Sequence, residues 1–99
     1  MKKFGMRFTP EASRNLSNFH PDNKKLIKQA LTELRQNPFA GTDLQEELSG
    51  FKSFKLGRYR VLYNIEEEEK IIQIFHIGHR KDVYEQFNRL LNQLRKPSK

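Results

Sequence analysis

The sequence predicts an α+β domain: a small, four-stranded, mostly antiparallel sheet with an N-terminal helical hairpin on one face and a C-terminal helix. Strand-like and helix-like patterns follow one another in the order β-α-α-β-β-β-α, with no repeat or low-complexity linker between them. The 99 residues are enough to bury one modest core and too few for two. We therefore expect a single domain over residues 1–95 and a flexible basic tail over residues 96–99.

The first part of the chain predicts one strand and the two helices of the hairpin. Apolar residues alternate over residues 2–8, which is typical of a strand. Thr9 then serves as an N-cap, with a proline and an acid directly behind it, and this combination starts a helix. Asp22 is expected to cap the second helix, which Asn37 and the following proline end. Apolar residues of the second helix recur at helical spacing: Leu26, Ile27, Ala30, Leu31 and Leu34.

The second half of the chain predicts three strands and a last helix. Gly57 bends the chain between the first two strands, and the glutamates at 66–69 form the next turn. The third strand, "KIIQIFHI", is the most apolar and is expected at the centre of the sheet. Asp82 is expected to cap the final helix. The strands cover residues 51–56, 59–65 and 70–77, and the helix stripe consists of Val83, Phe87, Leu90, Leu91 and Leu94.

Composition bounds the function. Nineteen Lys and Arg against 12 Asp and Glu give a net charge of +7, which attracts nucleic acid, an acidic protein or an anionic surface. The absence of cysteine excludes disulfides, thiolate zinc sites and a cysteine nucleophile. There is no long apolar run, and "MKKFGMRF" is too short and polar for a signal peptide, so we expect a cytoplasmic protein with no membrane partner.

The basic residues are concentrated where strands end. The stretch "GFKSFKLGRYRVLYN", residues 50–64, holds four cations and no carboxylate. Alternation places Arg60 opposite to the core side chains of its strand, on a sheet face that we expect to be open because all helices cover the other. Cations from three neighbouring strand ends then converge on one concave patch. The residues expected there are Lys52, Lys55, Arg58, Arg60, His79, Arg80 and Lys81, and Arg89 adds a further RNA- or ribosome-binding cation.

Such a patch suits RNA cleavage. RNA carries its own nucleophile, the 2′-hydroxyl, so a protein needs only a base, cations around the phosphate and an acid for the leaving 5′-oxygen. A lysine is the expected base, Arg60 and Arg80 the expected clamps on the transition state, and His79 or Tyr84 the acid. The histidines lack the spacing and carboxylates of a zinc centre, and His76 is expected to be a hydrogen-bonded structural residue. We therefore predict no metal and no cofactor.

The segments "LSGFKSFKLGRYRVLYNI" and "IIQIFHIGHRKDVYE" resemble the RelE/ParE superfamily of toxins from bacterial type II toxin–antitoxin pairs. The most specific pieces are L-S-G-F, Y-R-V-L-Y and G-H-R-K-D-V-Y, and the last favours the RelE branch over the gyrase-inhibiting ParE branch. This resemblance implies a ribosome-dependent endoribonuclease (an mRNA interferase) that cuts mRNA in the ribosomal A site.

The resemblance also implies site residues. RelE-type positions fall on Lys55, Arg60, Arg80 and Tyr84, and Lys52 lies near a second family lysine, although Ser53 aligns more strictly with it. The similar YoeB branch uses a histidine that falls on His79 and a glutamate that falls near Thr42 and Asp43. The base therefore stays open between Lys55 and Lys52, and the acid between His79 and Tyr84.

The expected partners are a cognate antitoxin that masks the site, the ribosome with its mRNA, and operator DNA only through the toxin–antitoxin complex. The alternatives are a ParE-like gyrase inhibitor or a degenerate toxin that only binds its antitoxin. A general RNA-binding module is a weaker alternative, because the strands lack exposed aromatic pairs on which bases stack.

Overall fold

The computed structural model describes residues 4–95 of the chain, so the predicted tail at 96–99 lies outside the described residues. None of the described helices combines the length and apolarity that crossing a bilayer requires. The elements, in chain order, are β1 (Gly5–Phe8), α1 (Pro10–Asn18), α2 (Pro21–Gln36), the 3-10 turn η1 (Pro38–Ala40), β2 (Thr42–Asp43), the 3-10 turn η2 (Glu46–Leu48), β3 (Lys52–Leu56), β4 (Tyr59–Glu66), β5 (Ile71–His79) and α3 (Val83–Arg95).

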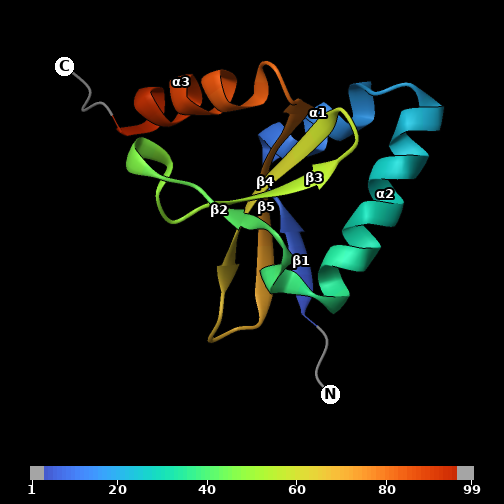
Figure 1. Cartoon of the computed structure of the whole chain (residues 1–99), viewed down its shortest axis with the longest axis horizontal. Helices are drawn as coiled ribbons and strands as arrows, with labels where there is room; N and C mark the ends of the chain where they lie inside the picture. The colour runs from blue at the N-terminus through green and yellow to red at the C-terminus, as the bar shows by residue number, and fades with distance from the viewer. Residues whose placement is uncertain (1–3, 96–99) are drawn as a thin grey trace.

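The strands form one sheet in the order β1-β5-β4-β3-β2, which confirms the predicted α+β class (Figure 1). Only β1 pairs in parallel, with β5, and the other pairs are antiparallel. The sheet has a fifth strand that was not predicted, because the two residues of β2 are too few to show alternation. The apolar strand β5 lies inside the sheet as expected, but β4 takes the middle position.

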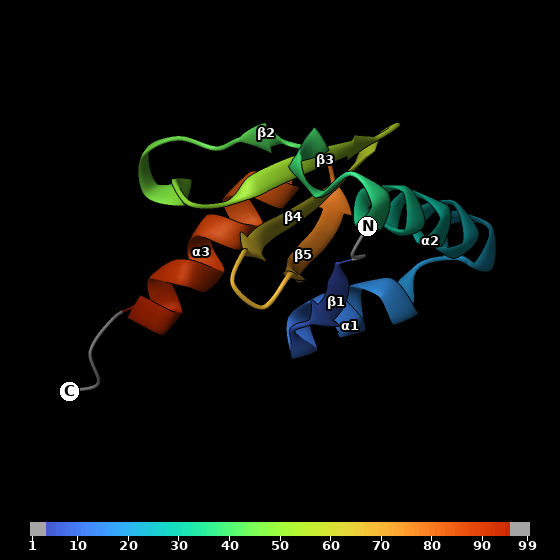
Figure 2. The same cartoon turned by 90° about the horizontal axis from the view of Figure 1, so that it is seen from below.

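Helices cover both faces of the sheet, so the expectation of one open face is wrong. α1 and α2 pack on one face, and α3 packs on the other, as Figure 2 shows. Leu62 lies on the side that alternation left open, yet it is fully buried with Val83 and Phe87 beneath α3. The reason is hydrophobic: α3 also carries an apolar stripe, and it can bury that stripe only against the second face.

The helix starts follow the local chemistry. Thr9 is the N-cap of α1, and its hydroxyl accepts a hydrogen bond from the Ala12 N–H at 3.1 Å. The N-cap of α2 is His20 rather than the predicted Asp22, and its Nδ1 accepts from the Asp22 N–H at 3.2 Å. Pro21 explains the difference, because its fixed φ suits the first helical position and leaves the preceding residue to cap.

Tyr63 fastens the connection between α2 and β3 to the sheet. Its side chain is fully buried, and its hydroxyl donates to the Pro38 carbonyl oxygen at 2.8 Å and accepts from the Gly41 N–H at 2.9 Å. A Cβ at Gly41 would lie only 2.5 Å from the Tyr63 hydroxyl. The glycine is therefore required by the close approach of the backbone to this ring.

We predict that Gly41→Ala lowers the free energy of unfolding by about 1–3 kcal/mol, because the added methyl overpacks the Tyr63 ring. Gly5→Ala is the matched control, since the nearest atoms to a Cβ there, from Ile71 and Lys70, would lie 3.9 Å away. The control should change stability by less than about 0.5 kcal/mol in urea denaturation. Equal effects of the two substitutions would contradict the role given to Gly41.

A second prediction concerns alkaline pH. Burial raises the pKa of Tyr63 above 10.0, the Asp43 charge raises it further, and the Gly41 N–H opposes the shift. Folding thus favours the neutral phenol. The stability that the neutral Tyr63 adds is fully present below the pKa of tyrosine in the unfolded chain, and it is lost as pH rises through the pKa of Tyr63 in the folded protein. Tyr63→Phe should cost about 1–3 kcal/mol below pH 10, because it leaves the Pro38 carbonyl unpaired. The difference in free energy of unfolding between this variant and wild type, measured by urea denaturation, should shrink at higher pH. A constant difference up to about pH 11 would contradict the role given to the neutral phenol.

Candidate functional site

The register of β3 against β4 brings two predicted site residues together. Lys55 lies directly opposite Arg60, and Arg60 lies next to Gly78 of β5. Side chains alternate along a strand, so Lys55 and Arg60 project on the same side as Leu62, the side that α3 covers further along the sheet. The hairpin turns at Gly57, whose φ of 56° lies in the left-handed region that favours glycine.

The backbone of this turn holds the Arg60 side chain. Its Nη1 donates to the carbonyl oxygens of Gly57 at 2.9 Å and of Tyr59 at 2.8 Å. A guanidinium has five N–H donors, so others remain available to a phosphate. Within residues 4–95, no carboxylate forms an ion pair with Lys55, Arg58, Arg60, Arg80 or Lys81.

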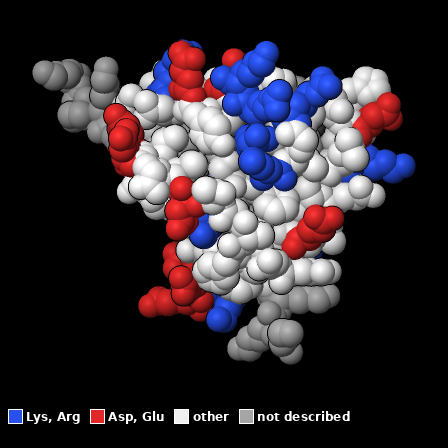
Figure 3. Space-filling view, viewed as in Figure 1, with Lys and Arg blue, Asp and Glu red and all other residues white. Residues whose placement is uncertain are grey.

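The chain after β5 returns to the same place. The Arg80 N–H donates to the Arg58 carbonyl oxygen at 2.7 Å, which joins the turn after β5 to the β3–β4 turn. Figure 3 shows basic side chains gathered at this end of the molecule, whereas many acidic side chains lie toward its other edges. We call this region the cationic end; it consists of Lys55, Arg58, Arg60, Arg80 and Lys81.

Tyr84 reaches the same side of the sheet from the first turn of α3. Its hydroxyl lies 2.9 Å from the Ser53 hydroxyl, and Ser53 is only 5% exposed. Ser53 precedes Lys55 by two residues on β3, so both project on the same side of the strand. The sequence did not predict the hydrogen bond between Tyr84 and Ser53. It showed Ser53 only as a serine at the position of a family lysine.

Lys52 does not join this group, although the sequence predicted that it would. It lies opposite Tyr63 and projects on the α1–α2 side, because it is one position out of phase with Ser53 and Lys55. Its Nζ is 2.7 Å from Asp43 Oδ1 and 5.8 Å from the centre of the Phe39 ring. The predicted cation Arg89 is also apart, since it lies further along α3 in an exposed ion pair with Glu85 at 3.2 Å.

His79 ends β5 beside the cationic end, but its ring lies on the opposite side of the sheet from Arg60. The ring is 6.1 Å from that of Tyr59, which in turn packs on Phe19 at 5.2 Å. His79 Nδ1 accepts the Lys81 N–H at 3.2 Å. Of the two predicted acids, only Tyr84 therefore shares a face with Lys55 and Arg60.

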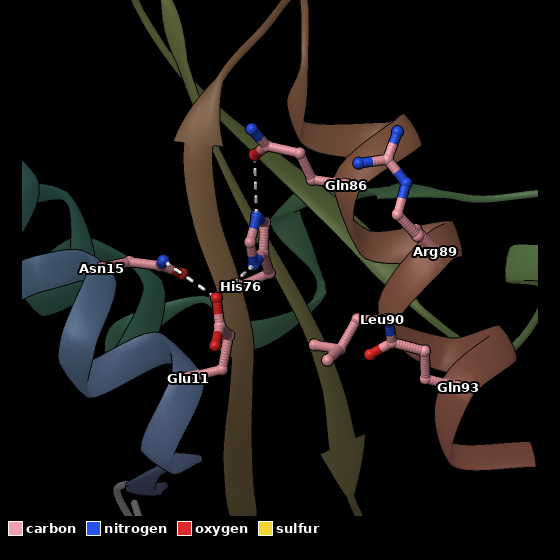
Figure 4. A pocket seen from close by; sticks show the side chains of 7 residues that line it. All are labelled: Glu11, Asn15, His76, Gln86, Arg89, Leu90 and Gln93. Atoms are coloured by element: carbon pink, nitrogen blue, oxygen red, sulfur yellow. Dashed lines mark hydrogen bonds and ion pairs between the residues drawn. The ribbon is translucent and has the colours of Figure 1, made fainter.

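His76 lines a separate pocket of about 340 Å³ between α1 and α3, as Figure 4 shows. It is 5% exposed, its Nε2 lies 3.2 Å from Gln86 Oε1, and its Nδ1 lies 3.9 Å from Glu11 Oε2. Its ring stacks on Phe87 at 6.1 Å. These contacts are those of the hydrogen-bonded structural histidine that the sequence predicted. No group of three or more potential metal-ligating side chains occurs in the part of the chain that the structure describes.

Comparisons with known proteins agree with this architecture. The family model for the ParE toxin of the type II toxin–antitoxin system parDE matches residues 6–84. Toxin RelG of Mycobacterium tuberculosis is 34% identical over 83 residues, which cover 82% of this chain and 95% of RelG.

Solved structures place the fold in the same group. A chain of the RelBE2 toxin–antitoxin complex from M. tuberculosis superposes with a TM-score of 0.73 at 32% identity, covering 80% of this chain and all of that one. Isolated E. coli RelE superposes with a TM-score of 0.68 over 92% of this chain and 98% of its own, and at 17% identity it supports the fold alone. The chain therefore belongs to the RelE/ParE superfamily of toxins from type II toxin–antitoxin systems.

Proposed function

We propose that this toxin is a ribosome-dependent endoribonuclease that cuts mRNA in the ribosomal A site, with the 2′-hydroxyl as nucleophile and without a metal. The observation that carries the proposal is the placement of Lys55, Arg60 and Tyr84 on one side of the β3–β4 hairpin, next to Arg80. A base, a phosphate clamp and a proton donor on one surface are what cleavage of an RNA linkage requires.

In this proposal each side chain has one role. Lys55 accepts the proton of the 2′-hydroxyl, and Arg60 and Arg80 neutralise the charge that develops on the phosphate oxygens. Tyr84 donates its proton to the leaving 5′-oxygen. Arg58 binds flanking RNA or ribosomal phosphates through its planar guanidinium, and Lys81 binds them as a point charge.

The geometry favours one member of each pair that the sequence left open. Lys55 is preferred to Lys52 as the base, because Lys52 is ion-paired with Asp43 on the other face. Tyr84 is preferred to His79 as the acid, because the His79 ring packs beside Tyr59 on the α1–α2 side.

The partners follow from the same surface and from the relatives. The M. tuberculosis relative of 32% identity was solved as a toxin–antitoxin complex, which supports a cognate antitoxin for this chain. An acidic segment of that antitoxin would cover the cationic end and exclude mRNA and the ribosome. Operator DNA is then contacted only through the toxin–antitoxin complex.

A second candidate is a ParE-like gyrase inhibitor or a degenerate toxin that only binds its antitoxin. It is favoured by the matching family model, which describes ParE toxins, and by Ser53 at the position of a family lysine. The gyrase inhibitor differs from the endoribonuclease in the nucleic acid that is damaged, and a degenerate toxin would damage neither DNA nor mRNA.

We predict that Arg60→Ala and Lys55→Ala each lower mRNA cleavage by about 100-fold or more. The first variant removes stabilisation of the transition state, and the second removes the base. Cleavage is measured by primer extension on mRNA from a translating extract. Lys52→Ala is the matched variant from the other face of β3, and it should keep activity within about threefold of wild type.

Full cleavage by Arg60→Ala would remove the proposed mechanism, and equal losses in Lys52→Ala and Lys55→Ala would remove the assignment of the base. Double-strand breaks in DNA with intact mRNA on expression of the wild type would instead establish the gyrase candidate.

A further inference from the structure

We propose that Ser53 is a positioning residue, whose hydroxyl holds the hydroxyl of Tyr84 against the scissile linkage. This inference deepens the proposed function and rests on it. Ser53 has no role in the reaction by its own chemistry, and it acts through the tyrosine.

Because Ser53 is buried, its hydroxyl needs a hydrogen-bond partner within the protein. Ser53 is 5% exposed and lies opposite Leu62, which is fully buried under α3. A hydroxyl at such a site is costly unless it is hydrogen-bonded. Its side-chain partner is the Tyr84 hydroxyl at 2.9 Å, so β3 and the start of α3 are joined through this pair.

The pair also sets the distance between the proposed acid and base. Lys55 follows Ser53 by two residues on the same side of β3, so their backbones are roughly 7 Å apart along the strand. Arg60 lies across from Lys55 on β4. Tyr84 belongs to a different element, and without Ser53 its hydroxyl could rotate away from this strand.

The direction of the hydrogen bond follows from the proposed step. If Ser53 donates to Tyr84 Oη, the phenol proton stays free to point at the 5′-oxygen of the RNA. The 2′-oxygen then bonds to phosphorus and loses its proton to the amine nitrogen of Lys55. The bond from phosphorus to the 5′-oxygen breaks with both electrons on oxygen, which takes the Tyr84 proton.

The products are a 2′,3′-cyclic phosphate and a 5′-hydroxyl. The resulting tyrosinate keeps the hydrogen bond from Ser53, and a hydrogen bond to a charged oxygen is stronger than one to a neutral oxygen. Proton exchange with water restores both side chains. Ser53 thus stabilises the transition state more than the ground state, which is the condition for an effect on rate.

Four single variants test the inference: Ser53→Ala, Ser53→Thr, Ser53→Val and Tyr84→Phe. Single-turnover cleavage of ribosome-bound mRNA is followed at several toxin concentrations, which separates the rate constant from the affinity. Ser53→Ala should lower the rate constant about tenfold and leave the affinity within about twofold. Thermal unfolding of each variant shows that it is folded at the assay temperature.

The threonine and valine variants form the decisive pair, because they have nearly the same shape and differ in the hydroxyl. Ser53→Thr should restore the rate to within about threefold of wild type, and Ser53→Val should remain as slow as Ser53→Ala. If Ser53 acts through Tyr84, Ser53→Ala should have no further effect on a Tyr84→Phe background.

The two possible failures are distinct. Equal rates for the threonine and valine variants, or independent losses in the double variant, would overturn the positioning role while wild-type cleavage upheld the proposed function. A folded wild type that cuts no ribosome-bound mRNA would overturn the proposed function and this inference together.

Discussion

The pairing register between β3 and β4 is the constraint on which the rest of the structure depends. Phe54 and Val61 face the core under α1 and α2, whereas Ser53 and Leu62 face α3, so both faces of the hairpin are specified by burial. A slip of one residue would turn Lys55 toward the core under α1 and α2 and turn Phe54 away from it. The register is therefore strongly determined. The same register places the proposed base beside the proposed phosphate clamp.

This arrangement has a cost. Like charges directly opposite each other on a sheet are destabilising, typically by a few tenths of a kcal/mol to about 1 kcal/mol. The fold tolerates the pair of Lys55 and Arg60 because it lies at the end of the hairpin, where carbonyl oxygens of Gly57 and Tyr59 bind the guanidinium. Violations of a local stability rule are expected where a protein must bind a ligand. Here the RNA phosphate would supply the missing negative charge.

Much of the fold could be predicted because its determinants are local. Alternation along β4 and the apolar stripe of α2 are visible in single segments, and so is the Thr9 cap. The sheet face that α3 covers could not be predicted. The apolar stripe of a terminal helix shows that the helix packs on the sheet, but it does not show on which face. Among the proposed site residues, Lys55 and Arg60 could be predicted from their own strands, although Lys52 stayed open as an alternative to Lys55. The exclusion of Lys52 required the phase of β3 and its Asp43 partner, and the bond between Ser53 and Tyr84 joins residues 31 positions apart.

The most direct test of the central claim is the structure of this toxin on a ribosome programmed with mRNA that lacks the 2′-hydroxyl at the cleavage site, so that the linkage stays intact. The account predicts that the scissile phosphate lies within hydrogen-bond distance of Arg60, with Lys55 toward the 2′ position and the Tyr84 hydroxyl toward the 5′-oxygen. A phosphate bound instead on the face of Lys52 and Phe39, with Arg60 still turned onto its own hairpin, would contradict it.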